Sequence, residues 1–235
     1  MPFSETSTNT GAVQEMNDIC NSDNNSYPLT AKARRVNLAL DRFFTLAFQA
    51  DGRWTWDDLS VSTVPIETLN LVSGTQSYNL SALTSDILKL LRVEVVQDND
   101  DAIDLTRLDR NLVTGALTEY MSTNGTPAEY DLVGNFIYLY PAPNYAKTNG
   151  LRFYFNRNKV AFISTDTSKT LPVPSLFNKY ICNHASLPYL IEAGKAHKND
   201  IAALIANDEV AILKYFARRE PNENYILMPE IIDSM

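Results

Sequence analysis

Metal-dependent chemistry is the first possibility that the sequence raises, because it contains two histidines, His184 and His197. They lie thirteen positions apart and belong to no HExxH or CxxC motif. A zinc site needs more ligands at closer spacing. The sequence also lacks the GxSxG, Walker and GxGxxG motifs, which place a nucleophile or cradle phosphates. We therefore expect both histidines to be structural or solvated, and the sequence predicts no catalytic residue, no metal and no cofactor.

The acidic run DNDDAID, Asp98 to Asp104, is a candidate calcium loop. An EF-hand loop places oxygen ligands at positions 1, 3, 5 and 12 and glycine at position 6. Counted from Asp98, position 5 is Ala102 and position 6 is Ile103, so two requirements fail. The run instead predicts an acidic hairpin turn.

Aromatic residues offer a third kind of chemistry, stacking. Trp54 and Trp56, beside Arg53, would suit a platform for single-stranded nucleic acid, but no basic groove surrounds them in sequence. We expect the two indoles to be core or interface anchors. With 12 Tyr, 10 Phe and two His in the chain, the composition favours a contact surface over an active site.

Charge and composition narrow the function classes further. The net charge of −8 argues against a protein that grips nucleic acid by its phosphates, although DNA could pass along such a surface without sticking. No apolar run is long enough to span a membrane, and the N-terminus does not resemble a secretory signal. Cys20 and Cys182 are far apart and predict no disulfide framework, so folding in a cytosol is expected.

The elements that position these residues follow an α+β order, because helical and strand patterns are segregated rather than alternating. We expect an N-terminal helix over residues 30–49, a β-rich, antiparallel, sandwich-like middle over 53–165, and helices over 174–218. Pro188 is expected to kink or break the first of these C-terminal helices. Together they form one predicted domain, residues 27–220.

Extended termini flank this domain. Residues 1–26 are rich in Ser, Thr, Asn and Asp and predict a flexible or partner-ordered tail, with a short helix around Val13 and Met16 as an alternative. Residues 221–235 form a C-terminal tail whose apolar side chains either pack on the same domain or dock on a partner. The large apolar side chains of this tail are further interface candidates, and they are Tyr225, Ile226, Leu227, Met228, Ile231 and Ile232.

Within the middle, two strand pairs joined by turns are predicted. LLRVEVVQ, residues 90–97, pairs with AIDLTRL through the turn at 98–101. EYDLV and FIYLY flank the Gly134-Asn135 turn. Further segments with strand character are IETLNLV, GTQSYNL, LRFYFNR and VAFIS, and residues 109–122 predict a short helix.

The order of these motifs resembles that of the head-to-tail adaptor, or connector, proteins of tailed bacteriophages. The resemblance covers residues 27–190 and runs through SYPLTAKARRVNLALDRFF, ADGRWTWDD, PIETLNLVSGTQSYNL, RVEVVQD, TPAEYDLVGNFIYLYPAPN, LRFYFNR and LPVPSLFNKYI. It implies a structural virion protein at the neck that forms a ring of twelve copies. Its implied partners are the portal on one face, a stopper, nozzle or tail protein on the other, and neighbouring subunits. DNA would cross the lumen without specific binding, and the family has no catalytic residues to carry over.

Other functions remain open at this point. The chain could be another neck, tail-completion or minor capsid protein. A carbohydrate-binding module would use the aromatics for stacking, but helices at both ends do not suit a freestanding sandwich. A hydrolase using carboxylates distant in sequence is the remaining alternative.

Overall fold

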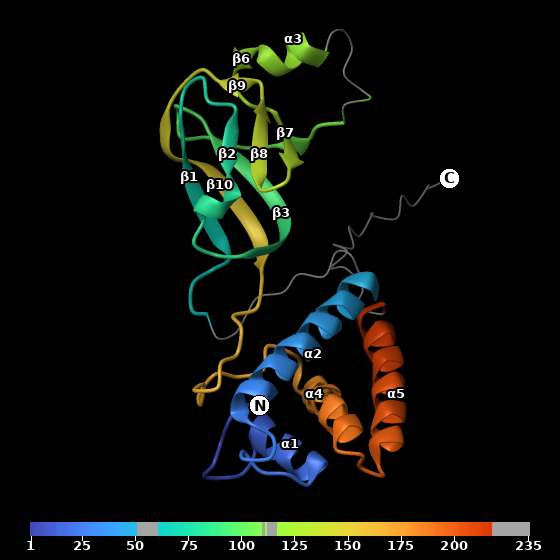
Figure 1. Ribbon diagram of the computed structural model, residues 1–235. Helices are drawn as coiled ribbons and strands as arrows, with labels where there is room; N and C mark the ends of the chain where they lie inside the picture. Colours follow the sequence, from blue (N-terminus) through green and yellow to red (C-terminus); the bar gives the residue numbers. More distant parts are fainter. Residues whose placement is uncertain (51–60, 110, 112–116, 218–235) are drawn as a thin grey trace, which may run out of the picture. The chain divides into compact units, whose positions relative to one another are not determined.

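The computed structural model describes residues 1–50, 61–109, 111 and 117–217. Helices come first and last in the chain and strands lie between them, which confirms the predicted α+β class (Figure 1). The chain divides into two compact units. We call residues 1–55 with 161–235 the helical unit, and residues 56–160 the β unit.

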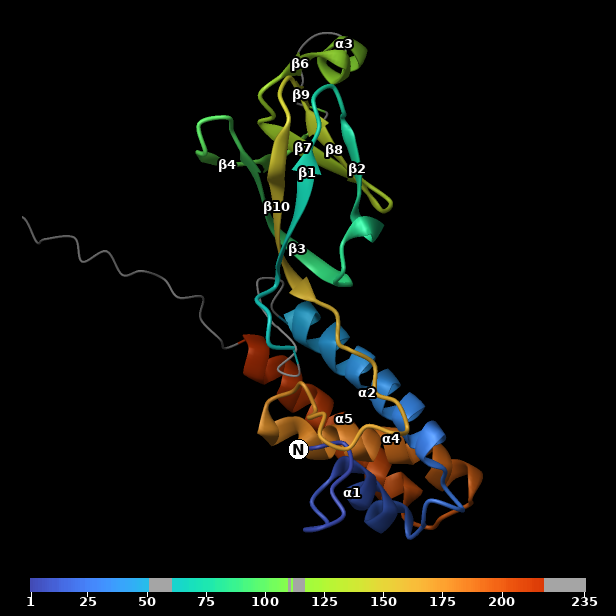
Figure 2. The same cartoon turned by 90° about the vertical axis from the view of Figure 1, so that its left-hand side faces the viewer.

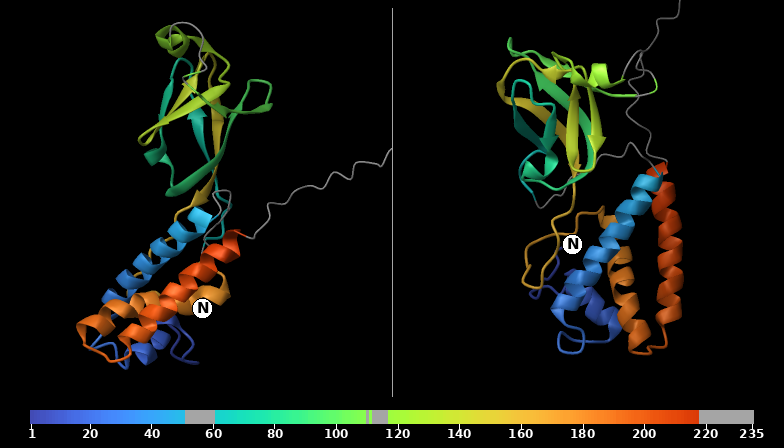
Figure 3. Two further views of the ribbon diagram at one scale, coloured as in Figure 1. Left: turned by 90° about the vertical axis from the view of Figure 1, so that its right-hand side faces the viewer. Right: turned by 45° about the horizontal axis from the view of Figure 1, so that its top comes forward.

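The helical unit is built on α2 (Leu29–Ala50), α4 (Asn178–Glu192) and α5 (Lys198–Ala217), which pack against one another (Figure 3). The 3₁₀ turn η2 (Ser175–Phe177) leads into α4. The apolar positions of α2 recur at spacings of three and four, so one face of this helix is buried. Phe43 lies at the centre, with its ring centroid 5.5 Å from that of Phe177 and 5.8 Å from that of Phe216.

The N-terminal segment packs on this unit, so the prediction of a flexible tail over residues 1–26 is wrong, and the alternative, a short helix around Val13 and Met16, is confirmed. Residues Ala12–Cys20 form helix α1, which packs against α4. Phe3 is fully buried, its amide donates to the Lys169 carbonyl at 2.8 Å, and its ring lies 5.2 Å from that of Phe162. The polar composition of the segment did not indicate this packing, because a few apolar residues are enough to fill its contact with the helices.

A buried lysine ties this segment to α2. The Lys32 ammonium is buried and donates to Asn17 Oδ1 of α1 at 2.5 Å and to Asn24 Oδ1 of the following loop at 2.8 Å. It also lies 5.1 Å from the ring centroid of Tyr27. Burial lowers the pKa of Lys32 to about 8, because the ammonium has lost most of its hydration.

Helix α4 continues through Pro188 to Glu192, so of the two predicted outcomes, a kink or a break, the break is wrong. The last turn is held by packing and by the chain beyond it. Leu190 is buried in a cluster with Cys20 and Tyr27, and the Ala193 amide donates to the Tyr189 carbonyl at 2.8 Å. Proline removes one helical hydrogen bond, and these contacts outweigh that loss here.

The β unit contains two four-stranded sheets (Figure 2). The first has the order β1-β10-β3-β4, formed by Ile66–Leu71, Lys147–Arg157, Ile87–Val96 and Ala102–Asp104. The second has the order β2-β8-β7-β5, formed by Ser77–Asn79, Phe136–Tyr140, Glu129–Val133 and Thr106–Arg107. A two-stranded pair joins β6 (Asn124–Gly125) to β9 (Ala142–Pro143). Short helical turns are η1 (Leu80–Ala82) and α3 (Leu117–Ser122).

One core lies between these sheets, since alternate residues of strands from both sheets share a buried cluster. Its members are Leu71, Tyr78, Val93, Val95, Leu105, Ile137, Leu139, Leu151, Phe153 and Phe155. Two predicted pairings are confirmed. β3 pairs with β4 across the acidic turn, and β7 pairs with β8 through Val133 and Phe136 around the Gly134-Asn135 turn.

Three details differ from the sequence prediction. The pairs β5–β7 and β6–β9 are parallel, so the sandwich is not wholly antiparallel. The segment VAFIS forms no strand, because Phe162 instead packs in the helical unit, where its amide and carbonyl bond the side chain of Asn37. In the predicted helix 109–122, the described helical part is α3.

Candidate functional site

The two histidines occupy separate structural positions in the helical unit. The ring of His184 lies 5.8 Å from that of Tyr180, and burial lowers the pKa of His184. A ring nitrogen of His197 lies 2.7 Å from the Ile19 carbonyl oxygen, which joins the start of α5 to α1. Among the described residues, no three His, Cys, Asp or Glu side chains are grouped so that they could hold a metal ion.

The acidic run forms the predicted hairpin turn between β3 and β4. Asp100 has a positive φ of 69°, and the Lys147 ammonium lies 2.7 Å from its carboxylate. Lys147 also donates to the Asp98 carbonyl at 3.3 Å. This lysine lowers the pKa of the Asp100 carboxyl by hydrogen bonding and charge. The turn is therefore held by a cation from β10, a neighbouring strand of the same sheet.

Among the described residues, the shifted pKa values of the two cysteines and of Tyr120 do not indicate an activated nucleophile. Burial raises the pKa of both the Cys20 and Cys182 thiols, so they stay protonated. Tyr120 donates a hydrogen bond to Glu129, and this raises the pKa of Tyr120 to about 12. An enzyme nucleophile usually needs the opposite shift. These groups therefore act as structural contacts.

The eight interface candidates from the sequence lie outside the described residues, so the structure neither brings them together nor separates them. They are Trp54, Trp56, Tyr225, Ile226, Leu227, Met228, Ile231 and Ile232.

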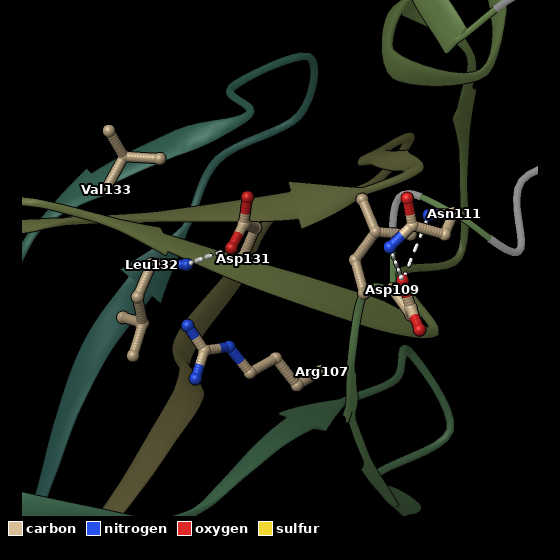
Figure 4. A pocket seen from close by; sticks show the side chains of 7 residues that line it. Arg107, Asp109, Asn111, Asp131, Leu132 and Val133 are labelled. Carbon is tan, nitrogen blue, oxygen red and sulfur yellow. Dashed lines mark hydrogen bonds between the residues drawn. The ribbon is translucent and has the colours of Figure 1, made fainter.

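An open hollow of about 650 Å³ lies in the β unit, where β5 meets β7 (Figure 4). We call it the Arg107 hollow. In Figure 4 the Arg107 side chain extends into it, and the Asp131 carboxylate accepts from the Leu132 amide at 2.8 Å. Asp109 accepts from the amide and the side chain of Asn111, which fixes the loop at its edge. Its other lining residues are Leu108 and Val133.

The surface beside the Arg107 hollow is partly apolar. Val133 and Phe136, which flank the β7–β8 turn, are 49% and 42% exposed. Exposed aliphatic and aromatic side chains next to an arginine and carboxylates are typical of protein contact surfaces. A shallow hollow of this kind does not enclose a small substrate.

A second hollow, of about 250 Å³, lies in the helical unit between the start of α2 and α4. We call it the Tyr27 hollow. Its wall is the stacked pair Tyr27 and Tyr189, whose ring centroids are 4.6 Å apart. Arg34 and Arg35 line it, and within the described part of the chain neither forms an ion pair. Glu192 also lines this hollow, so two guanidinium groups face one carboxylate. The remaining positive charge beside stacked aromatic rings favours an acidic partner segment.

Sequence reasoning missed both hollows. The run KARR, residues 32–35, was the signal that could have predicted the Tyr27 hollow. Its helical spacing indicated only that these side chains lie off the apolar face of the helix. The Arg107 hollow had no local signal, because β5 and β7 are separated in sequence and meet only by parallel pairing.

None of the helices in the described ranges is both long and apolar enough to cross a membrane. The family model of the SU10 adaptor protein matches residues 12–219 of the chain. The search of curated proteins found no match to the chain.

Proposed function

Because the chain belongs to the SU10 adaptor protein family, a family of phage head–tail adaptors, we propose that it forms a ring between the portal and the tail. The match carries this proposal, since it spans all of the β unit and the helical unit except residues 1–11 and 220–235. Membership makes the protein a virion component and an adaptor that binds other virion proteins. Its place in the neck and its ring symmetry are the proposal.

The proposed partners are the portal on one face, a stopper, nozzle or tail protein on the other, and identical subunits at the sides, twelve in the ring. A subunit in a closed ring contacts its two neighbours through different surfaces. The part of the chain that the structure describes offers distinct surfaces of suitable chemistry. The Arg107 hollow with Val133 and Phe136 is one, and the Tyr27 hollow with Arg34 and Arg35 is another.

The proposed role in the DNA channel is passive. The net charge of −8 opposes tight binding of a phosphate backbone, so DNA would pass without specific contacts. The acidic β3–β4 turn is one surface of the right charge to face the lumen. We propose no enzymatic activity, in keeping with a family of structural adaptors.

The eight sequence candidates remain part of this proposal. Trp54 and Trp56 are proposed to anchor contacts with a neighbouring subunit or the portal, because indole rings bury large apolar areas at interfaces. Their position in the sequence, close to the boundary of the two units, suits a contact that is completed on assembly.

Cryo-electron microscopy of the virion neck tests the proposal. We expect a ring directly below the portal whose subunit density fits the helical unit and the β unit as two separately placed bodies. Twelve copies are expected. A position in the tail or capsid shell, away from the portal, would instead make the protein a tail-completion or minor capsid component.

A further inference from the structure

Helix α5 has an exposed face that is almost entirely apolar. Its buried side consists of Ile205, Ile212 and Phe216, which pack toward α2 and α4. On the opposite side Leu204, Val210 and Tyr215 are 45%, 49% and 45% exposed. We call the exposed positions between Asp200 and Lys214, together with Tyr215 and Ala217, the outer face of α5. Between those two charges they are Ala202, Ala203, Leu204, Ala206, Asn207, Val210 and Ala211.

This outer face carries no charge over about three helical turns. A surface helix normally alternates an apolar stripe with a charged or polar face, and α5 is apolar on both sides. Its acidic residues, Asp208 and Glu209, lie at its flanks and are half-buried. The outer face therefore has the chemistry of a covered surface.

A covering segment of matching chemistry follows directly in the chain. Residues 218–235 follow Ala217, the last described residue of α5, and the stretch 224–232 within them contains six large apolar side chains. We propose that in the free subunit residues 224–232 lie against the outer face of α5, running back along the helix from its C-terminal end.

The lengths fit this arrangement. Helix α5 has 20 residues and is roughly 30 Å long at 1.5 Å per residue. The fourteen residues from Asn222 to Met235 span about 46 Å when extended, which is more than enough. With Asn222 beside Ala217, six further extended residues cover about 20 Å, and this brings Met228 to Leu204.

Charges fit the same register. Glu223 would lie near Lys214, and Glu230 would lie near Lys198 at the other end of the helix, while Tyr225 would cover Val210. The acidic residues thus meet lysines at the two ends, and the apolar residues meet the uncharged stretch between them. Because the segment is tethered, its effective concentration at this surface is on the order of millimolar, which favours it over a second molecule. This inference concerns the free subunit and does not depend on a ring in the neck.

Disulfide trapping in the full-length chain tests the register. The variant Leu204→Cys/Met228→Cys is oxidised under mild conditions and analysed on non-reducing gels and by mass spectrometry of the linked peptides. We expect an intramolecular disulfide. The native Cys20 and Cys182 are buried with raised thiol pKa values, so they do not compete. Circular dichroism verifies that each variant is folded.

Two controls separate docking from random collision. In Leu204→Cys/Arg219→Cys, the two-residue tether after Ala217 reaches about 7 Å. Even with the roughly 6 Å that a disulfide bridges between Cα atoms, it falls short of the roughly 20 Å to position 204, so this pair gives the background. Adding Val210→Asp to the first pair should slow trapping about tenfold, because one aliphatic contact is lost and a charge is buried. Thr30→Asp, an equal charge added at an exposed position of α2, should leave the rate unchanged.

The outcomes are distinct. An intramolecular bond that Val210→Asp slows supports the proposal. A disulfide-linked dimer would overturn it and show that a second copy covers α5. Trapping at the background rate, or trapping that Val210→Asp does not affect, would also overturn it.

Discussion

Arg42 on α2 and Glu209 on α5 form a two-point ion pair, with Nε to Oε1 and Nη2 to Oε2 distances that are both 2.8 Å. The Tyr180 hydroxyl of α4 donates to the same Glu209 carboxylate at 3.4 Å. One carboxylate thus joins the three long helices of the helical unit. This contact connects residues 167 positions apart in sequence.

The Glu209 ion pair should make stability depend on acid pH. The hydrogen bond from Arg42, followed by its charge, lowers the pKa of Glu209 in the folded protein. The stabilisation is therefore present above the ordinary pKa of 4.5 and is lost as pH falls through the lower folded value. We expect Glu209→Gln to cost about 0.5–1 kcal/mol at pH 7, since the pair is partly exposed. Chemical denaturation at pH 7 and pH 3 should show that this cost is smaller in acid; an equal cost at both would contradict the assignment.

Unlike the charged form of Glu209, the charged form of Lys32 should destabilise the fold, so stability should rise at alkaline pH as Lys32 loses its proton. Its pKa falls from 10.5 in the unfolded chain to about 8 in the folded protein, chiefly by burial. The penalty for burying the ammonium is thus complete below pH 8 and fades as pH rises toward 10.5. We expect the unfolding free energy of the wild type, relative to Lys32→Met, to increase by about 1–3 kcal/mol between pH 7.5 and 10. Cys182 is present in both proteins and cancels in this difference, whereas Cys20 interacts with the Lys32 charge, so both proteins carry Cys20→Ala. Parallel pH profiles would refute the role of Lys32.

Phe43→Ala should destabilise the helical unit by about 3–5 kcal/mol, because the ring is fully buried among those of Phe44, Phe177, Tyr180 and Phe216. Thermal unfolding followed by circular dichroism measures the effect. Leu38→Ala on the same helix, at a position that is 50% exposed, is the matched control and should change stability by less than about 1 kcal/mol. Similar midpoints for the two variants would argue against the packing of α2.

Gly134→Ala should cost about 1–2 kcal/mol through backbone conformation alone. Gly134 occupies the β7–β8 turn with a φ of 59°, and a Cβ added there meets no atom within 4 Å. Steric overlap is therefore not expected to contribute. Equilibrium denaturation of Gly134→Ala beside Gly134→Asn checks this, since asparagine tolerates positive φ better than alanine and should recover part of the loss.

The purified protein should be largely monomeric at micromolar concentration and should assemble only on the portal. The motive is that the Arg107 and Tyr27 hollows are not large apolar interfaces, and that residues 224–232 are proposed to cover the apolar outer face of α5 in the free subunit. Light scattering across a concentration series measures the mass. A stable ring in the absence of portal would disprove this prediction.

Local patterns in the sequence were sufficient for much of the fold. Helical spacing in residues 30–49 predicted α2, alternation predicted β3, β7 and β8, and the Gly134-Asn135 pair predicted their hairpin. These features depend on interactions between residues close in the chain, so the types and spacing of consecutive side chains predict them. The succession of such motifs also identified the adaptor family, which the family match confirms.

Other features were decided only by tertiary packing. The N-terminal segment is polar on average, yet α1 is held by α4 and by the Lys32 ammonium, contacts between residues up to 170 positions apart. The continuation of α4 past Pro188, the diversion of Phe162 from a strand, and the parallel β5–β7 pair likewise depend on distant partners. Neither hollow could be placed from the sequence, because each surface is assembled from segments that meet only in the folded chain. Propensity and periodicity measure what a segment can form alone, while burial against a distant partner decides which of those possibilities has the lowest free energy.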